Sequence, residues 1–114
     1  MRDLVRVFKA LSDPNRVRIL KMLEIRPLCV CEITRILNLA TSTVSKHLSI
    51  LRDADFILDH KEGKWVTYSL NRQTQSSYIE KILPLVSQWL DNEKTVLEDQ
   101  TKVRNFSKDN LCEI

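Results

Sequence analysis

Apolar side chains recur every three or four residues over most of the chain, and this spacing predicts a mainly helical protein. Asp13 is placed to cap the second helix, and Pro14 suits its first turn because no backbone donor is needed there. Pro27 interrupts the pattern and separates the second helix from the third. The first four predicted helices cover residues 3–11, 13–24, 31–37 and 42–53.

Two strand-like runs, residues 56–60 and 65–70, follow the fourth helix. The segment 61–64, Lys-Glu-Gly-Lys, lies between them. Gly63 is the only glycine in the chain, and a tight hairpin turn needs the positive φ that glycine adopts most readily. The two runs therefore predict a β-hairpin with a basic tip.

The pattern becomes helical again from about residue 75 to residue 106, and residues 107–114 are predicted to be a tail. Pro84 and the Asp91-Asn92 pair are the two candidate breaks in this region. Its apolar positions form a seam that is able to pack on another helix. With the first helix, this seam predicts a homodimer interface at Leu4, Phe8, Ile79, Ile82, Val86 and Trp89.

Composition narrows the class of protein. A chain of 114 residues with 43 % hydrophobic residues favours one packed domain, here residues 1–106. One glycine and three prolines exclude glycine-rich phosphate loops and disfavour an all-β fold. No apolar run approaches the roughly 20 residues that cross a bilayer, and the N-terminus carries no signal-peptide core. With three cysteines and no secretion signal, we expect reduced thiols in a cytoplasmic protein without membrane contact.

The net positive charge lies in the first part of the chain, which contains the predicted fourth helix. Residues 1–75 carry a net charge of +5 and residues 76–114 a net charge of −2, so a polyanion would prefer the first part. No acidic residue occurs from Ile33 to Arg52. Small hydroxyl and basic side chains can bond phosphates and base edges, whereas a merely solvated helix face would be expected to mix both charges. The predicted DNA contacts are Thr41, Ser42, Thr43, Ser45, Lys46, His47 and Ser49 on the helix and Lys61, Gly63 and Lys64 on the hairpin. For His47, a buried-edge position is the alternative to a DNA contact, and a metal ligand is disfavoured.

Two helices, a short turn and a basic hairpin are the order of a winged helix-turn-helix, a mainly α fold with a small β-hairpin. Four segments, residues 8–20, 28–33, 42–48 and 62–66, resemble the corresponding motifs of the arsenic-responsive (ArsR/SmtB) repressor family. The resemblance extends over about residues 5–70. It implies a homodimeric repressor that binds double-stranded DNA at an operator palindrome and is released when a metal or metalloid binds.

Cys29 and Cys31 are the candidate metal ligands, because thiolates are soft donors for thiophilic centres. Residues two apart on a helix point about 200° apart, so both sulfurs can reach one centre only if Cys29 lies outside the helix. As(III) and Sb(III), which we expect as inducers with no organic cofactor, favour three thiolates in a pyramid. Thr34 stands where the most familiar arsenic repressors carry a third cysteine. The third sulfur would then come from Cys112 or a small thiol, or be absent.

Other interpretations remain at this stage. The family's zinc sensors use histidines on the last helix, and residues 76–114 contain none, while its cadmium and lead sensors use an N-terminal extension that is not seen here. Release by Cd, Pb, Zn or thiol oxidation is the alternative to arsenic. A thiol enzyme or a winged helix used only for protein contacts is disfavoured, and no catalytic residues are expected. Arg16, Arg18 and Arg35 are either phosphate contacts or solvated charges.

Overall fold

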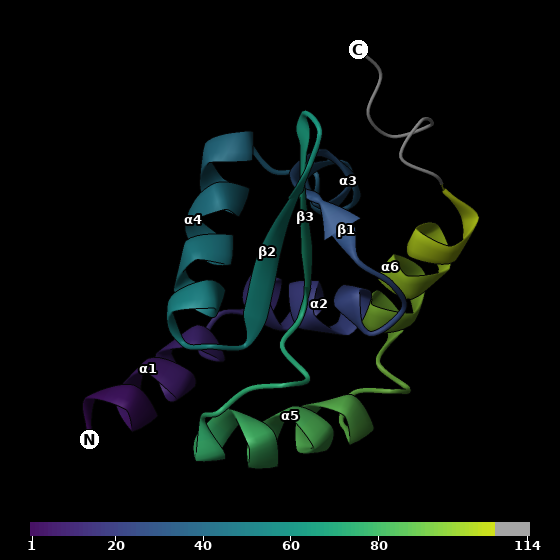
Figure 1. The fold of residues 1–114 in the computed structure, drawn as a ribbon. Coiled ribbons are helices and arrows are strands. Elements are labelled where there is room, and N and C mark those ends of the chain that lie inside the picture. Colours follow the sequence, from purple (N-terminus) through teal and green to yellow (C-terminus); the bar gives the residue numbers. More distant parts are fainter. Residues whose placement is uncertain (107–114) are drawn as a thin grey trace.

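The computed structural model describes residues 1–106 of the chain. In this part, helices surround a small antiparallel sheet (Figure 1). The elements, in chain order, are α1 (Arg2–Ala10), α2 (Pro14–Leu23), β1 (Leu28–Cys29), α3 (Val30–Leu37), α4 (Thr41–Asp53), β2 (Ile57–Glu62), β3 (Trp65–Leu70), α5 (Ser77–Gln88) and α6 (Lys94–Asn105). The winged helix-turn-helix predicted from the sequence is confirmed: α3 and α4 form the helix-turn-helix, and β2 and β3 form the wing.

Local signals in the sequence set the ends of the helices. The Asp13 carboxylate accepts a hydrogen bond from the Asn15 N–H at 2.8 Å and caps α2, with Pro14 in its first turn. Helix α3 ends at Asn38, whose left-handed backbone (φ 56°) turns the chain towards α4. Gly63 has a φ of +59° at the tip of the wing, as a tight hairpin requires.

The sheet has the order β1-β3-β2, and all its pairs are antiparallel. β2 and β3 form the predicted hairpin. β1 was not predicted, because two residues after Pro27 show no alternation of apolar and polar positions. It places Leu28 opposite Tyr68 and Cys29 opposite Thr67. The chain that precedes α3 is thereby fixed to the wing by backbone hydrogen bonds.

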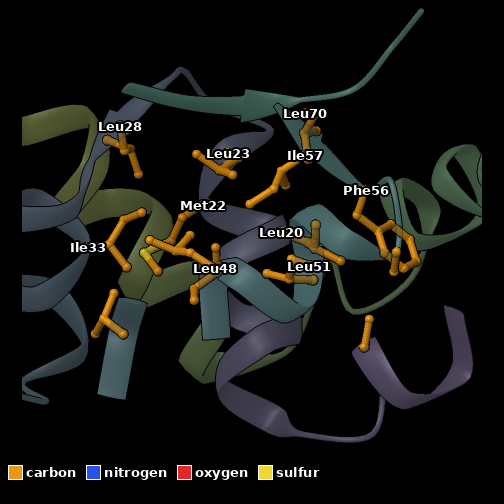
Figure 2. Packing of buried hydrophobic residues seen from close by; sticks show 14 of the residues in the cluster. Leu20, Met22, Leu23, Leu28, Ile33, Leu48, Leu51, Phe56, Ile57 and Leu70 are labelled. Atoms are coloured by element: carbon orange, nitrogen blue, oxygen red, sulfur yellow. The ribbon is translucent and has the colours of Figure 1, made fainter. Parts of the chain in front are cut away.

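The core lies between α2, α4 and the sheet (Figure 2). Leu20 from α2 faces Leu48 and Leu51 from α4, and all three are essentially fully buried. Phe56 and Ile57 close the core where α4 leads into the wing. Because these side chains hold α4 against α2 and β2, the opposite face of α4 is presented to solvent in a fixed orientation.

The C-terminal region contains two helices. α5 continues through Pro84 and ends at Gln88, and Leu90 then adopts a positive φ of 66° before α6 begins at Lys94. The break therefore falls around Asp91-Asn92. Pro84 is exposed, so water can bond the carbonyl that its missing N–H leaves without a helical donor.

A partly buried ion pair attaches α6 to α2. Arg18 Nε and Nη2 donate to the two carboxylate oxygens of Asp99 at 2.8 and 2.9 Å. The Gln100 amide also donates to the Lys21 carbonyl at 2.9 Å. Arg18 is therefore paired with a carboxylate of this chain, an arrangement that the sequence did not indicate.

The unequal exposure of this pair predicts unequal costs of disruption. The Arg18 side chain is 25 % exposed, whereas the Asp99 side chain is 2 % exposed. Arg18→Ala leaves a buried carboxylate without its partner and should lower the free energy of unfolding by about 3 kcal/mol. Asp99→Asn leaves Arg18 able to reach water and should cost about 1 kcal/mol. Urea unfolding of both variants measures the difference, and equal losses would contradict it.

Candidate DNA interface and cysteine site

The exposed side of α4 forms a recognition face of five residues: Thr41, Ser42, Thr43, Ser45 and Lys46. Val44 and Leu48 are buried on the other side of the helix. Ser49 is partly buried at the margin of the recognition face. Within α4, the first acidic residue is Asp53, at the far end. The recognition face is thus uniformly neutral or basic and is held in place by the core.

The wing carries the second group of predicted contacts. Lys61, Gly63 and Lys64 are exposed around the hairpin tip, and Lys64 Nζ lies 5.3 Å from the centre of the Trp65 ring. Figure 1 shows the tip at the same end of the molecule as the start of α4. The basic tip of the wing and the start of the recognition face therefore lie at the same end of the domain.

The structure places His47 at the buried edge of α4, one of the two positions that the sequence allows for it. It is 9 % exposed, and its Nδ1 atom lies 3.1 Å from Arg16 Nη1. His47 follows Val44 by three residues and precedes Leu48 and Leu51, so its spacing already placed it on the buried side of α4. The imidazole packs beneath the recognition face and is not part of its exposed surface.

Cys29 and Cys31 lie at the junction of β1 and α3. Cys29 is extended (φ −89°, ψ 165°) and is the N-cap of α3, while Cys31 lies in the first helical turn. Their sulfur atoms are 3.2 Å apart. Cys29 is 2 % exposed and Cys31 is partly buried. The predicted geometry, with one cysteine outside the helix and one inside it, is confirmed.

A buried carboxylate holds this junction. Glu32 is 1 % exposed, and its Oε1 accepts the Cys29 N–H at 3.0 Å. Its other oxygen lies 2.8 Å from Arg26 Nη2, and Arg26 also donates to the Val103 and Phe106 carbonyls at the end of α6. Burial is the main cause that raises the pKa of the Cys29 thiol, with the Glu32 carboxylate acting in the same direction. The resting Cys29 is accordingly favoured as a protonated thiol.

The separation of the sulfurs allows both to bind one centre. Sulfur atoms 3.2 Å apart would both reach a single soft metal or metalloid once they are thiolates. A soft centre is bound by thiolates, so both cysteines must be reduced and deprotonated to hold one. The Thr34 hydroxyl donates to the Val30 carbonyl at 2.7 Å and is a poor soft ligand. Cys112 lies outside the described residues, among which no group of three or more metal-binding side chains occurs.

The cysteine pair adjoins both DNA-binding elements. Cys29 and Cys31 line a hollow of about 300 Å³ together with Thr41 at the start of α4 and Lys64, Trp65 and Val66 of the wing. Cys29 is also in register with Thr67 of β3. The cysteine pair therefore lies against the wing and the first turn of α4.

The predicted dimer residues separate into two groups. Leu4, Phe8 and Trp89 are exposed, Phe8 to 59 %. Ile79 and Val86 are buried within the chain, and Ile82 is partly buried. A 3–4 spacing of apolar residues is expected both for a helix that packs within its own chain and for one that packs on a second copy, and one side of α5 packs within this chain. Figure 1 shows α1 and α5 at the end of the molecule away from the wing tip.

Comparison with known proteins gives a consistent result. The family model described as "Bacterial regulatory protein, arsR family" matches residues 13–58. The Escherichia coli K12 arsenical resistance operon repressor is 34 % identical over 93 % of this chain and 86 % of its own length. A Staphylococcus aureus cadmium resistance regulatory protein, a CadC homolog, is 41 % identical over 69 % of this chain and 66 % of its own length.

A solved structure supports the same assignment. HlyU from Vibrio cholerae N16961 is 30 % identical and superposes with a TM-score of 0.63 over 76 % of this chain and 90 % of that one. Among the described residues, no helix is both long and apolar enough to pass through a bilayer. Fold, recognition face and relatives agree: the chain belongs to the bacterial arsR family of DNA-binding transcriptional regulators, which are not enzymes.

Proposed function

We propose that this protein is a cytoplasmic repressor that leaves its operator when trivalent arsenic or antimony binds Cys29 and Cys31. The observation that carries the proposal is the hollow in which the cysteine pair meets the wing and the start of α4. The relatives named for arsenical resistance support arsenic as the inducer, and the relative named for cadmium resistance keeps a soft metal ion as the alternative.

The recognition face is suited to the major groove of double-stranded DNA. Its hydroxyl groups can donate to or accept from base edges, and Lys46 can bind a phosphate. Lys61 and Lys64 extend the basic surface to the adjacent backbone. Two copies related by a twofold axis would place two such faces on a palindromic site, with half-sites about one helical turn apart.

The release step follows from how the cysteines are anchored. Cys29 is fixed to β3 through the sheet, and Cys31 belongs to α3, which packs against α4. Drawing both sulfurs onto one centre changes the backbone between β1 and α3. Since Glu32 and Arg26 fix this junction from the other side, the displacement is directed towards the wing and α4. The DNA-bound arrangement of these two elements is thereby disfavoured.

Exposed apolar residues on α1 predict the dimer interface. Leu4, Val5 and Phe8 are exposed on one helix, which is unusual for a monomer. Phe8→Glu should convert most of the dimer to monomer and weaken operator binding by at least about tenfold, because the two half-sites are then bound independently. Sedimentation velocity gives the oligomeric state. Lys9→Glu, a neighbouring exposed position outside the apolar group, is the control and should remain dimeric.

The function is tested by fluorescence anisotropy on a duplex that the reduced protein selects from a random-sequence pool. The bound complex is titrated with arsenite, antimonite, cadmium and zinc, and separately with diamide as a thiol oxidant. Release by arsenite or antimonite at the lowest concentration supports the proposal. If cadmium, zinc or diamide releases the DNA at a lower concentration than arsenite or antimonite, the proposed inducer is wrong but the repressor function stands. If the protein selects no duplex, the repressor function is refuted.

A further inference from the structure

One buried arginine connects α1 to the recognition helix. Arg16, only 8 % exposed, donates from Nε to the Ala10 carbonyl and from Nη2 to the Lys9 carbonyl, both at 3.0 Å. Its third nitrogen, Nη1, lies 3.1 Å from Nδ1 of His47. Lys9 and Ala10 are the last two residues of α1, and the Lys9 carbonyl also accepts hydrogen bonds from the Ser12 N–H and hydroxyl. The Arg16 guanidinium thus contacts the end of α1 and a side chain of α4 at the same time.

The chemistry of this contact fixes which nitrogen of His47 accepts. An arginine side chain can only donate, so Nδ1 is the acceptor and the ring proton lies on Nε2. All three guanidinium nitrogens are engaged inside the protein. Arg16 and His47 also line one hollow with Ser42, Thr43 and Lys46 of the recognition face. The pair therefore lies directly beneath the residues proposed to contact DNA.

We propose that Arg16 and His47 are positioning residues that set the orientation of α4 relative to α1. The proposal rests on the proposed function, because α1 is the predicted dimer helix and α4 the predicted recognition helix. In a dimer the two recognition helices must enter successive major grooves together. The Arg16–His47 contact ties the position of each recognition helix to the interface, and so it determines affinity for a two-half-site operator more than affinity for DNA in general.

The test compares His47→Leu with His47→Asn. Asparagine places an oxygen acceptor where Nδ1 was, whereas leucine leaves the guanidinium without an acceptor. Binding of both variants is measured on the duplex selected by the wild-type protein and on a shuffled duplex of the same composition. We expect His47→Leu to lose about tenfold on the selected duplex and little on the shuffled one, and His47→Asn to recover to within about threefold of wild type.

Two further measurements separate positioning from direct contact. A positioning role leaves the dependence of log K on log salt unchanged, whereas a lost phosphate contact lowers its slope by about one. The ¹⁵N spectrum of the wild-type ring should show an unprotonated Nδ1 and a protonated Nε2, and Arg16→Met should remove this preference. Thermal unfolding shows whether each variant folds. If Arg16→Met does not fold, Arg16→Lys takes its place, because lysine keeps the charge but cannot form three directed contacts.

The outcomes are distinct. Equal losses of His47→Leu on both duplexes, a reduced salt slope, or wild-type affinity of His47→Leu would each overturn the positioning role while leaving the repressor intact. A proton on Nδ1 would also overturn it. If the wild-type protein selects no duplex, the proposed function fails instead.

Discussion

Cys29→Ser and Cys31→Ser should each bind the selected duplex within about threefold of wild type and no longer be released by arsenite. Neither sulfur lies on the recognition face, and serine preserves the size of the side chain, so DNA binding needs neither thiolate. Release needs both, because a hydroxyl is a poor ligand for a soft centre. In wild type, we expect arsenite to weaken operator binding by about 5- to 150-fold, the usual range of coupling between two sites.

Anisotropy titrations with arsenite measure this effect, and two further variants test how the site is completed. Cys112→Ser tests whether the third thiolate comes from Cys112. If arsenite no longer releases the DNA from this variant, Cys112 supplies the third thiolate. If release is unchanged, the third ligand is a small thiol or the site has only two sulfurs. Thr34→Cys adds a sulfur one helical turn after Cys31 and should increase arsenite affinity in a Cys112→Ser background. If Cys29→Ser is released at the wild-type arsenite concentration, the proposed site is wrong.

Much of this domain could be predicted because its signals are local. Spacing of apolar residues identified the helices, a single glycine identified the wing turn, and Asp13 with Pro14 fixed the start of α2. The position of Cys29 outside α3 followed from helix geometry, since residues two apart diverge by about 200°. Each of these inferences uses residues that are close together in the chain.

The features that escaped prediction depend on partners distant in sequence. β1 exists because β3, nearly forty residues later, supplies hydrogen-bonding partners for Leu28 and Cys29. Arg18 gave no sign of its partner Asp99 on α6. Periodicity shows that Ile79 and Val86 are buried, but it does not say whether they are covered by this chain or by a second copy. The buried-edge position of His47 is different, because the local spacing between Val44 and Leu51 already allowed it.

Ser42→Glu should abolish operator binding while leaving the fold at least as stable as wild type. Ser42 is exposed in the first turn of α4, which contains no acidic residue. A carboxylate there interacts favourably with the helix dipole, by about 0.3–1 kcal/mol, but it faces DNA phosphates across the groove. We expect at least a hundredfold loss of affinity, since a hydroxyl contact is lost and a repulsive charge is added.

Thr95→Glu is the matched control for this prediction, because Thr95 is exposed at the same second position of α6, whose first turn also lacks an acid. It makes the same change in net charge at the same kind of helix terminus. Thermal unfolding should show both variants folded, and anisotropy should show the loss only for Ser42→Glu. Equal losses would mean that net charge governs DNA binding, and no loss in either variant would mean that α4 is not the recognition helix. The contrast therefore separates the local surface of α4 from the overall charge of the chain, which the sequence alone left combined.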